Sequence, residues 1–313
     1  MRITCILNPS AGNGRAGKSN LKMKTLLKSA GLDAKVITTK DAIHSKQVAK
    51  EAAITSDIVV AVGGDGTIHQ VANGIICSES NAVLGIIPFG TGNDFVKMLD
   101  IPFHLESAIK ILAKGKRKVV DYGTVHYRTK SDDGACFFLN TLGIGFDAEV
   151  GHRASSFKVL PGVLAYLAAL FKTLRALRYT EAQIILDDNS ENLFYQGRFL
   201  LSSVGNGSTS GGLFKLTPNA KINDGWFDVC AIDSISVGRL LLSIPRVLRG
   251  THVNMRQYHA GRAKKVAIQL LDDAFRVTTA SGLPVHADGE ILAHDVHRLE
   301  VQIVEKGISV IVP

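Results

Sequence analysis

The sequence has little of what marks secreted, membrane-spanning or nucleic-acid-binding proteins. Its four cysteines are scattered over 313 residues without metal-ligand spacing, which excludes a disulfide framework and a cysteine-based zinc site. Aromatic residues make up only 6% and are not interleaved with the basic ones, so we expect no nucleic-acid partner. The longest uncharged apolar run, Val159 to Phe171, is too short to span a bilayer. The N-terminus leads directly into a strand and predicts no signal peptide, so we expect a cytoplasmic protein.

What is present is length and positive charge. A chain of 313 residues is long for one hydrophobic core and fits two domains. The net charge of +8 favours anionic partners, such as a nucleotide or lipid headgroups.

The pattern of strands and helices changes near residue 120. Before it, apolar strands alternate with helical stretches, which predicts a doubly wound, mostly parallel sheet in an α/β domain over residues 1–124. After it, strand-like runs dominate and predict a mostly antiparallel, sandwich-like β domain over residues 125–313. These later runs include 135–142, 296–304 and 308–312, and two helical stretches lie between them, at about 159–178 and 236–249.

Two glycine-rich loops follow neighbouring strands of the first domain. The strand that begins at Asp57 ends in Gly63-Gly64-Asp65-Gly66-Thr67, and the next ends in Gly90-Thr91-Gly92-Asn93-Asp94. Glycines let the backbone approach a ligand closely, and the helix N-termini that follow present free N–H groups to an anion. An acid beside a phosphate makes sense if magnesium or ordered water lies between them. The loops therefore predict a nucleotide-phosphate site, with Asp65 and Asp94 near the same ligand. The alternative is that both are ordinary strand-to-helix turns with capping acids.

A third glycine-rich segment allows another interpretation. Residues 12–19, Gly-Asn-Gly-Arg-Ala-Gly-Lys-Ser, match the P-loop pattern and follow a strand. Asn8-Pro9-Ser10-Ala11 intervene between that strand and the first glycine, and Pro9 would disturb the geometry of a P-loop, in which the strand runs almost directly into the glycine. We therefore favour a nucleotide contact by Asn8 to Gly12 over a true P-loop.

These motifs together resemble the diacylglycerol kinase catalytic-domain family, which includes soluble bacterial lipid kinases and the sphingosine kinases. Asn8-Pro9-Ser10-Ala11-Gly12 and the two loops above look like its signature, and the similarity continues in family order to Ala287-Asp288-Gly289-Glu290. The Gly-Gly-Asp-Gly-Thr motif alone also occurs in NAD kinases. The resemblance implies an NAD-kinase-like two-domain architecture and an ATP-dependent lipid kinase.

The resemblance also implies site residues. Those expected to contact ATP are Asn8, Pro9, Ser10, Ala11, Gly12, Thr39, Gly63, Gly64, Asp65, Gly66, Thr67, Ile68, His69 and Thr91. A magnesium ion would be held by the Asp224 carboxylate with the backbone oxygens of Lys221 and Trp226, an oxygen-only set that suits a hard cation. Asp65 and Asp94 belong to the acidic network, and Asp288 or Glu290 would take the proton from the lipid hydroxyl. From the residues alone, Asp288-Gly289 also predicts a hairpin turn.

Other residues are less informative. His252, His259, His294 and His297 are expected to be surface or strand residues. The stretch from Phe157 to Tyr179 is apolar with basic ends, and it predicts either a core helix or a helix that contacts a membrane.

The sequence thus predicts a cytoplasmic lipid kinase that uses ATP and Mg²⁺, and its expected substrate is diacylglycerol. We expect it to bind peripherally to the anionic inner membrane face, and a homodimer is possible. The alternatives are NAD-kinase-like phosphorylation of a soluble nucleotide and an inert lipid-binding protein on the same fold.

Overall fold

The computed structural model of the chain describes residues 1–155, 162–174, 179–187, 193–271 and 282–313. These residues form two compact units, one made of Met1–Asp121 with Lys306–Pro313 and the other of Tyr122–Glu305. The C-terminal segment thus belongs to the first unit, although the sequence assigned it to the second domain. The chain passes between the units through two long strands, β5 (Lys116–Arg128) and β15 (Arg298–Val312).

Unit 1 contains a parallel sheet with the strand order β15-β4-β3-β1-β2. Its strands are β1 (Ile3–Leu7), β2 (Ala34–Thr38), β3 (Ile58–Gly63), β4 (Val83–Pro88) and the end of β15. Every residue of β1, β3 and β4 is buried, as the continuous apolar runs predict for strands covered on both faces.

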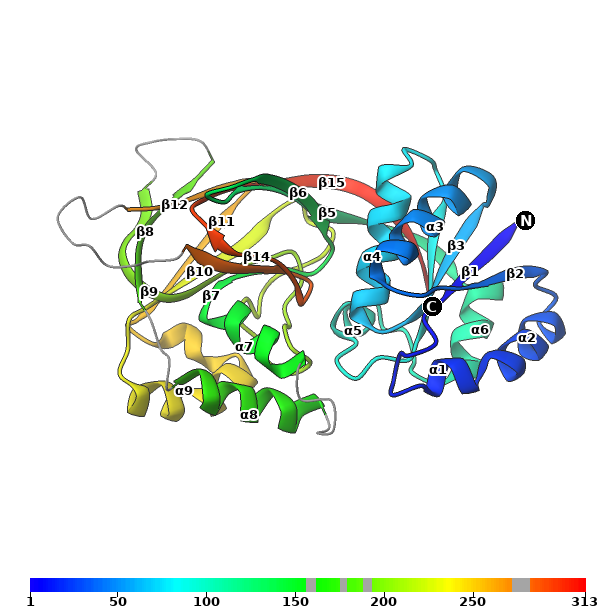
Figure 1. Cartoon of the computed structure of the whole chain (residues 1–313), viewed down its shortest axis with the longest axis horizontal. Coiled ribbons are helices and arrows are strands. Elements are labelled where there is room, and N and C mark those ends of the chain that lie inside the picture. The colour runs from blue at the N-terminus through cyan, green and yellow to red at the C-terminus, as the bar shows by residue number, and fades with distance from the viewer. Residues whose placement is uncertain (156–161, 175–178, 188–192, 272–281) are drawn as a thin grey trace. The chain divides into compact units, whose positions relative to one another are not determined.

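Helices cover both faces of this sheet (Figure 1). They are α1 (Arg15–Lys18), α2 (Asn20–Ser29), α3 (Ala42–Thr55), α4 (Asp65–Cys77), α5 (Asp94–Met98) and α6 (Leu105–Lys114). Ile3, Cys5 and Leu7 share a core with α2 and α6. Because side chains alternate along a strand, Thr4 faces the other side, where its hydroxyl lies 2.8 Å from that of Ser56 at the end of α3. The predicted doubly wound α/β domain is confirmed.

Unit 2 is mostly antiparallel β structure. Its strands besides β5 and β15 are β6 (Asp133–Phe138), β7 (Thr141–Gly145), β8 (Thr180–Leu186), β9 (Leu193–Gly205), β10 (Phe227–Asp233), β11 (Tyr258–Ala263), β12 (Lys265–Leu270), β13 (Leu283–Ala287) and β14 (Glu290–Val296). The long strand β9 pairs with β8 through its first half and with β7 and β10 through its second half. The predicted sandwich-like fold is confirmed.

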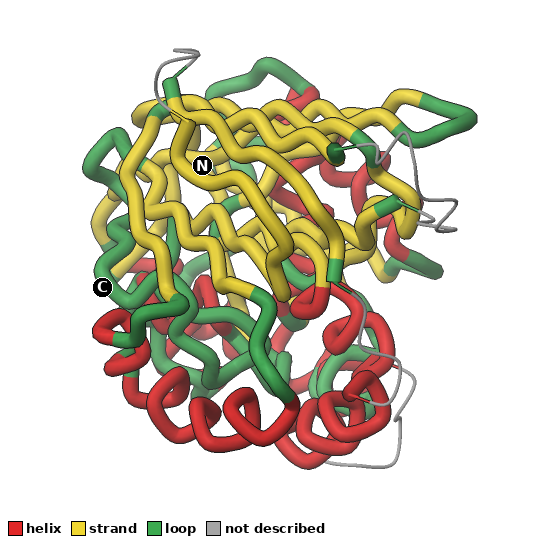
Figure 2. The backbone as a smooth tube through the Cα atoms, turned by 90° about the vertical axis from the view of Figure 1, so that its left-hand side faces the viewer, coloured by secondary structure: helices red, strands yellow, loops and turns green. Residues whose placement is uncertain are grey.

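The helices of unit 2 lie under its strands (Figures 1 and 2). They are α7 (Phe146–Ser155), α8 (Gly162–Leu174), α9 (Val237–Arg249) and the short 3-10 helix η1 (Thr251–Asn254). One core fills the space between the strands, and a second core joins α7, α8 and α9 to β9 and β10. The predicted helix over 157–179 is present as α8, while residues 157–161 and 175–178 lie outside the described residues.

Candidate functional site

Three loops meet at one edge of the unit 1 sheet. Residues 8–12, 63–67 and 89–94 follow the carboxyl ends of β1, β3 and β4, which are adjacent parallel strands. In an open α/β sheet this edge is where ligands bind.

Asn8 links the first loop to the second. Its side-chain amide donates to the hydroxyl of Thr67 over 3.1 Å, while its Oδ1 accepts the N–H of Ser10. The sequence predicted a contact of this loop with the nucleotide, and the structure assigns Asn8 a further role in joining the loops.

Arg15 links the first loop to the third. Its guanidinium donates to the carbonyl oxygens of Gly12, at 3.0 Å, and Phe89, at 3.3 Å. Gly12 has a φ of +61°, and a Cβ there would lie 2.4 Å from the Phe89 oxygen. The segment that resembles a P-loop therefore packs its backbone directly against the loop after β4.

The second and third loops touch through two glycines. A Cβ added to Gly64 would lie 2.9 Å from the Cα of Gly90, and one added to Gly90 would lie 2.6 Å from the Cα of Gly64. A side chain on either residue would force the backbones apart, which explains why the close approach uses glycine.

Asp65 binds the third loop with its carboxylate. The two oxygens accept the backbone N–H groups of Asn93, at 2.6 Å, and Asp94, at 2.8 Å. Asn93 has a φ of +51°, so the loop turns sharply at the start of α5. Asp94 is 7% exposed, and its carboxylate lies 3.5 Å from Nζ of Lys97. The structure thus brings Asp65 and Asp94 together within unit 1.

The other residues expected at ATP fall into two groups. Those on the loops that are at least partly exposed are Pro9, Ser10, Ala11, Gly64, Gly66 and Thr91. Thr39, Ile68 and His69 instead have buried side chains: the Thr39 hydroxyl donates to the carbonyl of Leu7, and His69 is 3% exposed. A nucleotide contact by Ile68 or His69 would therefore have to involve the backbone at the start of α4.

In unit 2, Asp288 and Gly289 form the tight turn between β13 and β14. Ala287 pairs with Glu290, and the two turn residues have φ values of +52° and +89°. Positive φ at both central positions is the geometry of a two-residue hairpin, as the Asp-Gly pair predicts.

The carboxylate of Asp288 is held by backbone donors. It accepts the N–H groups of Leu139, at 2.9 Å, Asn140, at 2.8 Å, and Thr141, at 3.1 Å. The N–H of Asp288 in turn donates to the carbonyl of Thr141. The predicted strand over 135–142 is therefore wrong as one element: it breaks into β6 and β7 at Leu139 and Asn140, whose N–H groups turn to the carboxylate.

Glu290 differs from Asp288 in its surroundings. It is half-buried at the start of β14, and over the described ranges its carboxylate has no hydrogen-bond or ion-pair partner. Of the two acids in the Asp-Gly-Glu segment, Glu290 is the one whose oxygens are open to another molecule.

A buried histidine adjoins this turn. The N–H of Gly289 donates to Nδ1 of His286 over 3.1 Å, and Nε2 of the same ring lies 3.0 Å from Oδ2 of Asp147. Because a backbone N–H can only donate, Nδ1 accepts, and the neutral ring carries its proton on Nε2, directed at Asp147. Both side chains are almost fully buried, at 3% and 4% exposed. A Cβ on Gly143 would lie 2.2 Å from His286 Nε2, so this glycine makes room for the pair.

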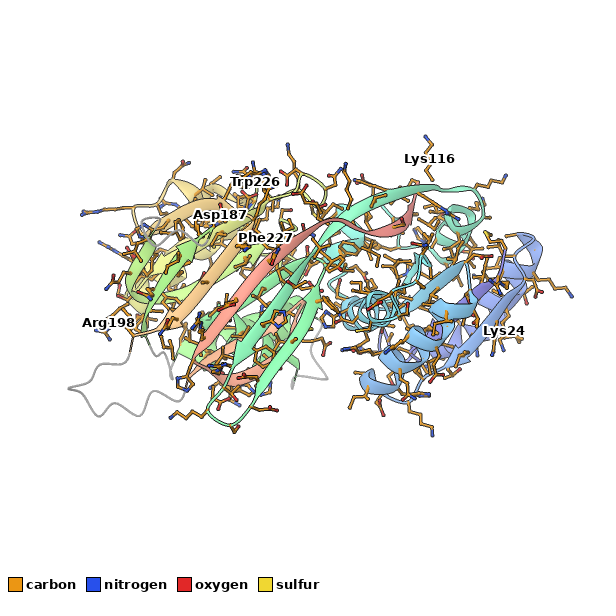
Figure 3. The ribbon with its side chains drawn as sticks, turned by 90° about the horizontal axis from the view of Figure 1, so that it is seen from above. Lys24, Lys116, Asp187, Arg198, Trp226 and Phe227 are labelled. Atoms are coloured by element: carbon orange, nitrogen blue, oxygen red, sulfur yellow. The ribbon has the colours of Figure 1, made fainter. Side chains whose placement is uncertain are left out.

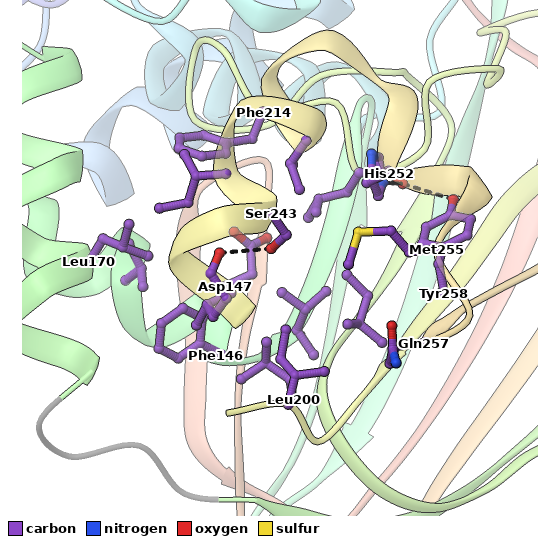
Figure 4. Close-up of a pocket in the computed structure, with 18 residues that line it drawn as sticks. Phe146, Asp147, Leu170, Leu200, Phe214, Ser243, His252, Met255, Gln257 and Tyr258 are labelled. Atoms are coloured by element: carbon purple, nitrogen blue, oxygen red, sulfur yellow. Dashed lines mark hydrogen bonds between the residues drawn. The ribbon is translucent and has the colours of Figure 1, made fainter. Parts of the chain in front are cut away.

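Asp147 also lines an apolar pocket between α7, α8, α9 and the strands of unit 2 (Figure 4). The pocket is a cavity of about 60 Å³ among mostly apolar side chains. Its apolar lining includes Phe146, Leu170, Leu200, Phe214, Leu240 and Met255. The polar side chains in the lining are Asp147, Ser243, His252, Gln257 and Tyr258.

His252 differs from its prediction. It lies in η1 rather than on a strand, is 1% exposed, and places Nε2 3.3 Å from the carbonyl of Leu216. Burial holds the pKa of His252 below its ordinary value, because the charged ring would lose its hydration. The expectation of a surface or strand residue is therefore wrong for this histidine.

In the expected magnesium loop, residues 221–226, the carboxylate of Asp224 already has a cationic partner from β11. Arg262 lies 2.5 Å from one oxygen of Asp224, and the other oxygen accepts the N–H of Trp226. Arg262 also lies over the ring of Trp226. Trp226 precedes Phe227, the first residue of β10 (Figure 3). No cluster of three acidic, histidine or cysteine side chains suited to a metal occurs in the described parts of the chain. A magnesium ion on Asp224 stays a prediction, and it requires Arg262 to leave that oxygen.

Asp147 and His286 are the residues of this region to which the sequence assigned no role. The Gly143-Ile144-Gly145-Phe146-Asp147 motif was a signal for Asp147, because Gly143 makes room around the acid. The pairing itself had no local signal, since 139 positions separate the two residues.

Two known domain families match the chain. Residues 2–125 match the diacylglycerol kinase catalytic domain, and residues 140–312 match the YegS C-terminal NAD kinase beta sandwich-like domain. A diacylglycerol kinase of Bacillus subtilis is 30% identical, over 92% of this chain and 89% of the relative. The chain belongs to the diacylglycerol kinase family. A diacylglycerol kinase of Mycobacterium tuberculosis is 29% identical, over 92% of this chain and 88% of the relative.

The fold agrees with this family. A crystal structure of a diacylglycerol kinase from Bacillus anthracis superposes with a TM-score of 0.73 at 23% identity, covering 100% of this chain and 97% of the other. The diacylglycerol kinase family consists of lipid kinases, which use ATP as phosphoryl donor, so the resemblance stated from the motifs is confirmed. Over the described residues, each helix is too short or too polar to cross a membrane.

Proposed function

We propose that this member of the diacylglycerol kinase family transfers the γ-phosphoryl group of ATP to the free hydroxyl of diacylglycerol, with Mg²⁺ accompanying the nucleotide. The observation that most supports a lipid substrate is the apolar pocket of unit 2. An apolar lining would not stabilise a polar nucleotide, whereas the transfer of acyl chains from water to such a lining is favourable.

The loops of unit 1 support the binding of ATP. Three loops joined by Asn8, Arg15 and Asp65 bring glycine backbone and the start of α4 to one edge of the sheet. Backbone N–H groups at a helix start bind phosphate well, because they are unsatisfied and carry partial positive charge. We assign the phosphates to Gly63 to Thr67 and to Thr91.

For the proton acceptor we propose Glu290 rather than Asp288. A general base must offer an oxygen to the hydroxyl it deprotonates. Both oxygens of Asp288 accept backbone N–H groups, and those bonds set the turn that presents Glu290. Phosphoryl transfer depends mostly on positioning and charge neutralisation, so one such base suffices.

Mg²⁺ would supply charge neutralisation at the phosphates. We propose it as the ion that enters with ATP and derive no step through the Asp224 loop, where Arg262 holds the carboxylate. We also propose peripheral association with an anionic membrane surface on the cytoplasmic side, because the substrate resides in a bilayer and the chain carries a net charge of +8. A homodimer stays a prediction.

The test is γ-phosphate transfer from labelled ATP to diacylglycerol dispersed in neutral detergent, with and without Mg²⁺. The wild type is compared with Glu290→Gln and Asp288→Asn. We expect labelled phosphatidic acid from the wild type and a loss of at least a hundredfold in Glu290→Gln, the size expected for a general base.

Three outcomes would change the proposal. Label only in a water-soluble product would favour phosphorylation of a soluble nucleotide. No transfer by the wild type, with ATP still bound, would favour an inert lipid-binding protein. A fully active Glu290→Gln beside an inactive but folded Asp288→Asn would return the base to Asp288.

A further inference from the structure

Helix α9 has two faces of different character. Leu240, Ser243, Ile244 and Val247 line the apolar pocket from its inner face. Gly238, Leu242, Pro245 and Arg249 recur at spacings of four, three and four residues, so they share the opposite, outer face. All four of these are exposed, and Leu242 is 79% exposed.

The outer face is basic as well as apolar. Arg249 belongs to the outer face, Arg239 and Arg246 lie together on one flank of it, and all three are exposed. The thirteen residues of α9 include no aspartate or glutamate. Within the described part of the chain, none of the three guanidinium groups has an ion-pair partner. The positive charges of the three arginines are therefore not neutralised by acidic side chains nearby.

The exposed apolar residues do not stand alone. Val237 and Leu248 on α9 are 41% and 36% exposed, and Phe171 on α8 is 56% exposed beside the exposed Lys172. Leu170 of α8 and Leu240 of α9 belong to one core, so α8 and α9 are neighbours in the helical layer of unit 2 (Figure 1). Single exposed leucines are normal on protein surfaces, but a group of them among cations marks an interaction site.

We infer that the outer face of α9 docks on an anionic lipid bilayer. Leu242 enters the boundary between headgroups and acyl chains, while Arg249 and the flanking Arg239 and Arg246 contact lipid phosphates. An acidic protein would complement the arginines, but a leucine at 79% exposure is better satisfied by a hydrocarbon phase. The proposal rests on the lipid-kinase function and extends it: the helix that touches the bilayer is also a wall of the pocket, so a lipid leaves the membrane next to its binding site.

The test is co-sedimentation of the full chain with vesicles of phosphatidylcholine alone and of phosphatidylcholine mixed with phosphatidylglycerol. The variants are Leu242→Ser and the triple change Arg239→Gln, Arg246→Gln and Arg249→Gln. A matched control for the leucine is Leu21→Ser, because Leu21 on α2 is also 79% exposed. The control for charge is Lys35→Gln, Lys50→Gln and Lys110→Gln, three exposed lysines of unit 1.

We expect the wild type to bind the anionic vesicles and to release in high salt. The triple arginine variant should lose about a hundredfold in partitioning and Leu242→Ser about tenfold, while both controls bind like the wild type. The substituted side chains are exposed, so all variants should unfold at wild-type temperature.

Kinase assays separate this inference from the function on which it rests. On detergent-dispersed diacylglycerol the α9 variants should keep wild-type rates, and on anionic vesicles they should lose activity in proportion to binding. Three outcomes would overturn the inference. The folded α9 variants could bind vesicles as well as the wild type does, the controls could lose as much binding as the α9 variants, or the wild type could show no preference for anionic vesicles. A wild type that binds vesicles but phosphorylates no lipid would instead overturn the proposed function.

Discussion

An aspartate organises a loop in each unit, Asp65 in unit 1 and Asp288 in unit 2. Both carboxylates accept backbone N–H groups from a segment distant in sequence: Asp65 from residues 93 and 94, and Asp288 from residues 139, 140 and 141. A carboxylate makes strong hydrogen bonds with backbone amides. It therefore satisfies N–H groups that a sharp turn leaves without a backbone acceptor.

The two units differ in what the neighbouring acid does. In unit 1, Asp94 is buried and paired with Lys97 of the same helix, so its carboxylate already has a cationic partner. In unit 2, Glu290 follows the turn with an open carboxylate. The comparison teaches that an acid in a signature motif can be needed for structure first, and that its neighbour can carry the chemistry.

The largest effect is expected for Asp288→Ala. It leaves three backbone donors without their acceptor, and we expect a loss of about 3 kcal/mol in unfolding free energy. Urea unfolding followed by fluorescence measures this, since the single tryptophan, Trp226, lies in unit 2. Glu290→Ala is the matched control and should change stability by less than about 0.5 kcal/mol. Equal losses in the two variants would contradict the contrast between Asp288 and Glu290.

Asp65→Ala should have a somewhat smaller effect. Two donors lose their partner instead of three, and part of that region is exposed, so we expect a loss of about 2 kcal/mol. The third loop would lose its position, and ATP binding should weaken at least tenfold. Circular dichroism and calorimetric titration with ATP measure the two quantities. An unchanged ATP affinity in a folded variant would mean that the loop does not need this carboxylate.

Gly143→Ala tests the support beneath the Asp288 turn. The new Cβ would lie 2.2 Å from His286 and 2.5 Å from the Asp147 carboxylate, and we expect a cost of about 2 kcal/mol from overpacking. Gly151→Ala on α7 is the matched control, because a Cβ there meets nothing within 4 Å and alanine favours a helix. Thermal unfolding of both variants decides the matter: similar melting temperatures would show that the His286–Asp147 pair tolerates displacement.

Asp228, beside the Asp224 loop, should give the smallest effect. Burial raises the pKa of Asp228 above its ordinary value of 3.8, and Asp224 adds to this shift while Arg262 opposes it. Between the ordinary and the raised pKa the folded state binds more protons than the unfolded one, so stability falls as pH rises through that window.

Asp228→Asn should remove this part of the pH dependence and change stability by less than about 1 kcal/mol at neutral pH. Urea unfolding at a series of weakly acidic pH values measures the slope. A steeper slope in the variant would contradict the direction of the shift.

Much of this protein followed from sequence alone. Continuous apolar runs determined the parallel strands of unit 1, because burial on both faces requires them. Glycine next to acid after two adjacent strands predicted the loops, and Asp-Gly predicted the hairpin at residues 288–289. Each of these signals is local: it depends on the backbone preferences and side-chain sizes of a few consecutive residues.

Only the tertiary structure decided which residues that are distant in sequence contact one another. Residues 135–142 are apolar enough for one strand, yet the carboxylate of Asp288, almost 150 positions away, takes the amides at the break. The predicted runs 296–304 and 308–312 instead join into β15, which continues into the unit 1 sheet. The His286–Asp147 pair and the burial of His252 have the same origin. Hydrogen-bond donors, acceptors and apolar surfaces pair with the groups that the fold brings near them. A local sequence pattern does not indicate which distant residues those are.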